Sequence, residues 1–144
     1  MIFVVNAGSS SIKVALFDGG ETPVLTGIVS EIGGASRLSV GSVAAEAEAP
    51  THEAALALLI EGFAAAGHPL SALRAAGHRV VHGGGDLVAP ASVTEAVLRQ
   101  IEAAVPLAPL HNPHNLSAIR ALMRLAPDLP QVACFDTGFH ATSP

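Results

Sequence analysis

Charged side chains are scarce in this sequence. Asp, Glu, Lys and Arg make up 13% of its 144 residues, whereas about 25% is usual in globular proteins. Apolar residues reach 50%, and the mean hydropathy is +0.50. Such a chain can bury a core, which excludes intrinsic disorder and indicates one compact domain. The apolar excess also favours a covering partner, either an oligomer interface or a second domain, and composition does not choose between them.

Basic residues are few and scattered. Seven Lys and Arg stand against twelve Asp and Glu, which gives a net charge of -5 and a pI of about 5.7. The basic residues are spread from Lys13 to Arg124 and form no stripe that could follow a phosphate backbone. We therefore expect no nucleic acid partner.

Long hydrophobic runs are absent as well. The longest stretch without a charged residue, 103–119, contains three prolines, so it is not expected to span a membrane. The apolar run 1–5 follows no basic residue and is too short for a signal peptide, so we expect a cytoplasmic protein. The single cysteine, Cys134, stands in the apolar run 132–135, which predicts a buried, inert thiol.

The pattern of apolar residues predicts a mixed α/β fold. Strands are expected at 2–5, 12–17, 24–32 and 38–43, forming an antiparallel meander whose first turn contains the small residues 7–11. Helices are expected at 53–66 with Thr51 as N-cap, at 94–105 and at 112–125, with further strands at 79–81 and 131–135. This order indicates a mixed sheet covered by helices.

The first chemical cluster is the segment 6–13, NAGSSSIK. It lacks the second glycine of a Walker loop, and the residues after it alternate like a strand, so we expect a hairpin turn. Backbone N–H groups, the hydroxyls of Ser9 and Ser11 and the charge of Lys13 could together bind an anion. The alternative is a serine-rich surface turn.

The second cluster is the segment 77–84, GHRVVHGG. Alternation along a strand places Arg79 and Val81 on one face and His78 and His82 on the other. An arginine buried there needs an anionic partner, which could be a substrate carboxylate or phosphoryl group, or an internal Asp or Glu. We interpret the two histidines as packing or hydrogen-bonding residues.

Two further segments carry polar groups at the ends of expected elements. His111 directly precedes a helix N-terminus, which favours a neutral imidazole that could donate to a phosphoryl group. No third ligand supports a zinc site with His111 and His114. Asp136 ends the last strand and could orient a substrate or organise magnesium, or serve only as a cap or turn residue.

Taken in this order, the four clusters resemble the acetate and propionate kinases, which belong to the superfamily of actin, sugar kinases and the Hsp70 ATPase. The resemblance runs from end to end of the chain. It implies that residues 1–144 are the incomplete N-terminal domain of a two-domain protein, as family members have a second domain. Gly85 and Gly138 depart mildly from the family pattern and remove no functional side chain.

The resemblance also implies roles for individual residues. Phosphate or ATP would be bound by Ser9, Ser11 and Lys13, and magnesium would lie close to Asn6. The acyl substrate would be held by Arg79, Val81 and Leu110, and the proposed catalytic residues are Arg79, His111 and Asp136.

The implied activity is reversible phosphoryl transfer between ATP and acetate, which gives acetyl phosphate and ADP with Mg²⁺ as cofactor, on a route to acetyl-CoA. The resemblance implies a homodimer for the full-length form. The 144-residue chain alone is expected to be inactive. The alternatives are a propionate kinase and a non-catalytic remnant that binds phosphate or a partner.

Overall fold

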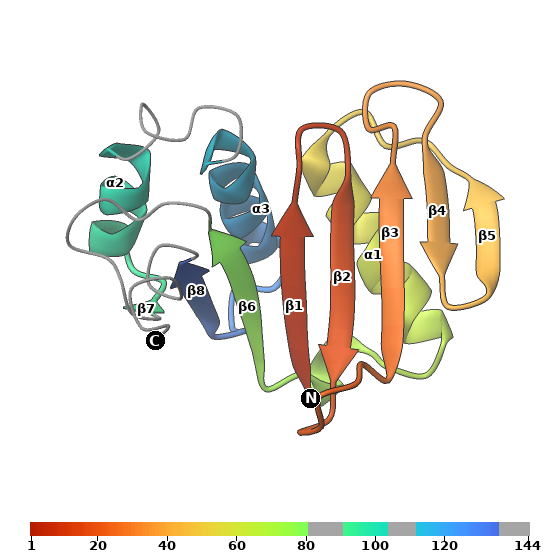
Figure 1. Cartoon of the computed structure of the whole chain (residues 1–144), viewed down its shortest axis with the longest axis horizontal. Helices are drawn as coiled ribbons and strands as arrows, with labels where there is room; N and C mark the ends of the chain where they lie inside the picture. The colour runs from red at the N-terminus through yellow and green to blue at the C-terminus, as the bar shows by residue number, and fades with distance from the viewer. Residues whose placement is uncertain (81–90, 104–111, 136–144) are drawn as a thin grey trace, which may run out of the picture.

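A computed structural model describes residues 1–80, 91–103 and 112–135. Within these residues, eight strands form one mixed sheet in the order β5-β4-β3-β2-β1-β6-β8-β7. Two helices, α1 and α3, lie side by side behind the sheet, and α2 packs against α3 (Figure 1). The predicted fold class, a mixed α/β sheet with helices, is confirmed.

The N-terminal half of the sheet is an antiparallel meander, as predicted. Its strands are β1 (Ile2–Ala7), β2 (Ile12–Phe17), β3 (Leu25–Ser30), β4 (Arg37–Val40) and β5 (Val43–Glu46). The prediction of a single strand over 38–43 was wrong, because the chain turns back between Val40 and Val43. Gly41 has a φ of 58° there, a left-handed conformation that glycine adopts at little cost.

The other half of the sheet contains parallel strands. Strand β6 (Ala75–Val80) runs parallel to β1, and β8 (Gln131–Phe135) runs parallel to β6. The carboxyl ends of β1, β6 and β8 therefore lie at one edge of the sheet. The two-residue strand β7 (Ala91–Ser92) pairs with β8 and was not predicted, because two residues carry no periodic pattern.

The helices follow the predicted signals closely. Their bounds are α1 (His52–Ala65), α2 (Glu95–Ala103) and α3 (Asn112–Leu125), and a short 3₁₀ helix (Leu70–Ala72) precedes β6. Thr51 caps α1 as expected, since its hydroxyl accepts a hydrogen bond of 3.1 Å from the Ala54 N–H. No helix in the described ranges has both the length and the hydrophobicity needed to cross a bilayer.

Among the described residues, helices cover one face of the sheet and leave the other uncovered. Side chains of β1 to β4 alternate, and the buried set packs against α1, where the rings of Phe3 and Phe63 meet edge to face at 5.3 Å. A second apolar cluster joins α2 and α3 to the parallel strands; it contains Val80, Leu98, Ile101, Ile119 and Ala133. The alternate side chains stand on the opposite face, which we call the open face.

Close packing of α1 on the sheet depends on Gly27 of β3. A Cβ atom at this position would lie 2.7 Å from Cε1 of Phe63 and 3.0 Å from Cδ2 of Leu59. We expect Gly27→Ala to lower the free energy of unfolding by about 1–3 kcal/mol, because the core must shift to admit the methyl group. Urea denaturation would measure this, with Gly20→Ala as control, since a Cβ there meets nothing within 4 Å. Equal stability of the two variants would contradict the prediction.

Candidate functional site

Five of the residues predicted for the site lie at the edge of the sheet where β1 and β6 end: Asn6, Ser9, Ser11, Lys13 and Arg79. The turn between β1 and β2 lies at this edge, and so do the N-terminal ends of α1 and α3 (Figure 1). Segments that are distant in the sequence therefore meet in one place, a usual location for ligands in α/β folds.

The turn between β1 and β2 is the predicted hairpin. Ala7 pairs with Ile12, and the Gly8 N–H donates a hydrogen bond of 2.8 Å to the Ser11 carbonyl. Ser9 is exposed and Ser11 is half-buried. No helix begins at Ser10 or Ser11, and β2 follows directly, so this segment is not a Walker loop.

Three of the predicted side chains form a row on the open face. Asn6 of β1 and Lys13 of β2 are cross-strand partners. Val5 pairs with His78, which makes the following residues, Asn6 and Arg79, neighbours across β1 and β6. Asn6, Lys13 and Arg79 are exposed, and all three line an open groove of about 450 Å³ that also includes Phe17.

The predicted alternation along β6 is confirmed, whereas the expected burial of Arg79 was wrong. His78 and Val80 are buried beneath the helices, and Arg79 stands exposed on the open face. Water can solvate the exposed guanidinium of Arg79, so the stability of the fold does not require an anionic partner for it.

His78 has the hydrogen-bonding role that the sequence suggested. Its Nε2 lies 2.5 Å from Oε1 of Gln131, and both residues are buried. An amide oxygen only accepts, so Nε2 carries the proton. Burial lowers the pKa of His78 to about 4, an effect that the Gln131 hydrogen bond partly opposes. The imidazole is therefore neutral at pH 7.

Cys134 contradicts its predicted burial. It pairs with Arg79 across β6 and β8 and is exposed, because its side chain stands on the open face. Partial desolvation still raises the pKa of its thiol. A raised pKa favours the protonated thiol near neutral pH, and the inertness of Cys134 stays a prediction.

The other predicted site residues, Val81, Leu110, His111 and Asp136, lie outside the described residues. His82 lies outside them as well.

The described residues fit a phosphate better than a bare metal ion. Among them, no group of three His, Cys, Asp or Glu could hold a metal. Asn6 offers a neutral amide oxygen, which Mg²⁺ accepts, but Lys13 and Arg79 beside it are cations. Magnesium would fit here together with the phosphates that it neutralises, and among the described residues Asn6 would be the one to hold it.

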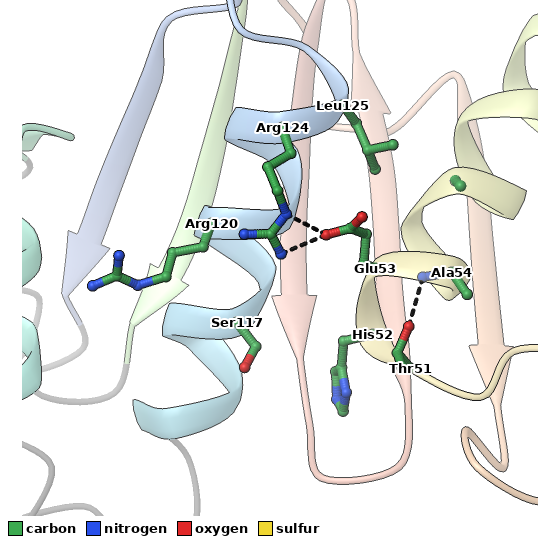
Figure 2. Close-up of a pocket in the computed structure, with 9 residues that line it drawn as sticks. Thr51, His52, Glu53, Ala54, Ser117, Arg120, Arg124 and Leu125 are labelled. Atoms are coloured by element: carbon green, nitrogen blue, oxygen red, sulfur yellow. Dashed lines mark hydrogen bonds and ion pairs between the residues drawn. The ribbon is translucent and has the colours of Figure 1, made fainter.

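Sequence reasoning missed a second group of residues, which lies between α1 and α3. An open cleft of about 740 Å³ separates the two helices; its polar lining residues are Thr51, His52, Glu53, Ser117, Arg120 and Arg124 (Figure 2). Arg124 forms an ion pair with Glu53 across the cleft, and Arg120 pairs with Glu102 of α2. These exposed pairs contribute little stability.

His52 connects this cleft to the β1–β2 turn. Its Nε2 lies 2.7 Å from the Gly8 carbonyl oxygen. Its ring also stacks on that of His114 in α3, with centroids 5.3 Å apart and planes 13° apart. Only its place directly after the N-cap Thr51 was visible in the sequence, because both contacts join segments that are far apart along the chain.

Taken together, the described site combines two cations, a polar amide and a turn rich in N–H and hydroxyl donors. No nucleophile is present in the row of Asn6, Lys13 and Arg79, whose three side chains stand on the same face of the sheet. The arrangement can bind and neutralise an anion of several oxygens, which is the main requirement of phosphoryl transfer.

Comparisons with known proteins identify relatives of this chain. The model of the acetokinase family matches residues 1–144. An acetate kinase from Streptomyces avermitilis is 46% identical over 153 residues, covering 99% of this chain and 38% of the relative. The crystal structure of Porphyromonas gingivalis acetate kinase superposes with a TM-score of 0.91 at 33% identity, covering 99% of this chain and 39% of that one. A propionate kinase from Francisella tularensis gives a TM-score of 0.91 at 34% identity, with 99% and 38% covered. This chain therefore spans less than two fifths of the length of these relatives.

Proposed function

Because this chain belongs to the acetokinase family, we propose that it forms the phosphate-binding and acyl-binding part of a kinase that transfers a phosphoryl group reversibly between ATP and acetate. In this proposal, residues 1–144 are an incomplete N-terminal domain. The observation that carries the proposal is the row of Asn6, Lys13 and Arg79 beside the Gly8–Ser11 turn.

The proposed chemistry is positioning and charge neutralisation. The turn donors of Ser9 and Ser11, with the Lys13 ammonium, hold phosphate oxygens of the nucleotide. Arg79 binds the carboxylate of acetate or the phosphoryl group in transfer, where its planar fork matches two oxygens. His111 donates to the phosphoryl group as a neutral imidazole, and Asp136 positions the acyl substrate or the metal.

Enzymes of this family use Mg–ATP. Magnesium, when bound with the nucleotide, supplies positive charge that neutralises phosphate oxygens. Asn6 is the residue of this chain that we expect nearest to it. Lys13 and Arg79 then neutralise the negative charge of the phosphate groups that magnesium leaves uncompensated on the open face.

The acyl substrate is proposed to be acetate. The small pocket for its methyl group would be lined by Val81 and Leu110. A propionate kinase is the second candidate, because the Francisella tularensis structure is as similar in fold as the acetate kinase structure. Comparing kcat/KM for acetate and propionate, measured on the hybrid enzyme described below, would decide between them.

Phosphoryl transfer is expected to require more than this chain, because the acetate kinases that it resembles are much longer. A hybrid enzyme tests the proposal: residues 1–144 joined to the part of the Streptomyces avermitilis relative that follows the matched region. We expect the hybrid enzyme to form ATP from acetyl phosphate and ADP, and the 144-residue chain to form none.

A folded but inactive hybrid enzyme would contradict the proposed function and favour the non-catalytic remnant. ATP formation by the 144-residue chain alone would instead show that the chain builds a complete site, and that its reading as an incomplete domain is wrong. We also propose that the full-length form is a homodimer, which light scattering on the hybrid enzyme would test.

A further inference from the structure

The backbone of the β1–β2 turn is held from outside the turn at two carbonyl groups. The Gly8 carbonyl lies 2.7 Å from Nε2 of His52, and the Ser10 carbonyl accepts a hydrogen bond of 2.9 Å from the Ile32 N–H. A carbonyl oxygen only accepts, so Nε2 of His52 carries the proton and donates it. His52 and Ile32 thus fix the orientation of two peptide groups that precede Ser9 and Ser11.

The direction of a carbonyl determines that of the N–H in the same peptide group. The described part of the chain contains no cis peptide bond, and in a trans peptide the C=O and N–H groups point in opposite directions. When the Gly8 carbonyl points to His52, the Ser9 N–H points away from it. In the same way, the hydrogen bond from Ile32 directs the Ser11 N–H away from Ile32.

His52 approaches the turn from the side of the helices. It stands in the first turn of α1, and its ring lies between α1 and α3 (Figure 2). The opposite side of the sheet is the open face with Asn6, Lys13 and Arg79. A Ser9 N–H that points away from His52 is therefore directed to the side of these cations.

We propose that His52 is a positioning residue for the phosphate site: its hydrogen bond to the Gly8 carbonyl orients the Ser9 N–H toward the bound anion on the open face. The inference rests on the proposed function, since it assumes a phosphate group at this turn. His52 does not touch the anion. It fixes a donor before binding, so that the ligand need not order the turn.

His114 supports this arrangement through its ring. The stacked rings of His52 and His114 limit the rotation of the His52 side chain and keep Nε2 directed at Gly8. The stack also ties the start of α3 to the start of α1, so both helices help to position the turn.

Two substitutions separate the hydrogen bond from the stacking. His52→Phe keeps an aromatic ring against His114 but removes the donor. His52→Gln keeps an N–H donor but removes the ring. His68→Ala, beyond the C-terminal end of α1, is the matched control. Thermal melting of each variant identifies any loss of the fold.

The orientation of the Ser9 N–H is measured by its one-bond residual dipolar coupling in the ¹⁵N-labelled 144-residue chain. Pyrophosphate is the probe of binding, followed through the amide shifts of Ser9 and Ser11. We expect His52→Phe to change the Ser9 coupling and to weaken pyrophosphate binding about tenfold, the loss expected for one donor to a charged acceptor. His52→Gln keeps a donor but loses the stacked ring, so it should change the Ser9 coupling and the pyrophosphate affinity less than His52→Phe does. His68→Ala should leave both quantities unchanged.

An unchanged Ser9 coupling in His52→Phe would overturn the inference. So would a changed coupling with unweakened pyrophosphate binding, and that result would leave the proposed function intact. Failure of the unsubstituted chain to bind pyrophosphate at the turn would instead count against the proposed phosphate site itself, and the inference would fall with it.

Discussion

Arg79→Leu in the hybrid enzyme is expected to lower kcat roughly 100-fold, equivalent to about 3 kcal/mol of transition-state stabilisation. The guanidinium is exposed on the open face beside Asn6. In the proposed function it neutralises charge at the reacting centre, whereas the nucleotide is held mainly elsewhere. The KM for ATP should therefore change much less than kcat.

Steady-state kinetics with acetate and ATP would measure this effect. Arg79→Lys is the informative second variant, since it keeps the charge but loses the planar guanidinium fork. Its kcat should lie between that of the unsubstituted hybrid enzyme and that of Arg79→Leu. Arg120→Leu is the control, because this arginine pairs with Glu102 on the helix side. A kcat that Arg79→Leu leaves unchanged would refute the proposed role.

The buried His78 should make the stability of the fold depend on pH. Its pKa is lowered to about 4 in the folded chain from 6.5 when unfolded, so between these values the unfolded chain binds more protons. The contribution of neutral His78 to the free energy of unfolding is therefore fully present above pH 6.5. It is lost progressively as the pH decreases toward 4. A shift of this size corresponds to about 3 kcal/mol lost by pH 4.

Urea denaturation at several pH values would test this, with His78→Gln as the comparison. This variant removes the titrating imidazole, so its stability should decrease less between pH 7 and pH 4 than that of the unsubstituted chain. Parallel stability curves for the two proteins would show that His78 does not cause the pH dependence.

The parts of the fold that depend on local pattern could be predicted from the sequence. Thr51, a strong N-cap residue, marked the start of α1, and the alternation around Arg79 gave the correct faces for His78, Arg79 and Val80 in β6. The turn at Gly41 was missed because apolar residues lie on both sides of it. Its positive φ cannot be recognised from hydrophobicity alone.

Burial and distant contacts were harder to predict. Arg79 and Cys134 stand in apolar runs but are exposed, because the described helices cover only the opposite face of the sheet. The sequence alone does not reveal which face stays open. The contact of His52 with Gly8 depends on how α1 packs, which is a tertiary property.

The pairing of β1 with both β2 and β6 has a consequence for how the site forms during folding. Asn6 and Lys13 belong to one hairpin, so they meet as soon as a short loop closes. Arg79 joins them only when β6 pairs with β1, and the rest of the meander and α1 lie between these two strands in the sequence. The site thus unites contacts of low and high sequence separation, and the pairing of β6 with β1 requires the larger loss of chain entropy. The β1–β2 turn can therefore form before Arg79 is placed beside it. Of the three residues in the row, Arg79 is the one whose position depends on the pairing of β6 with β1.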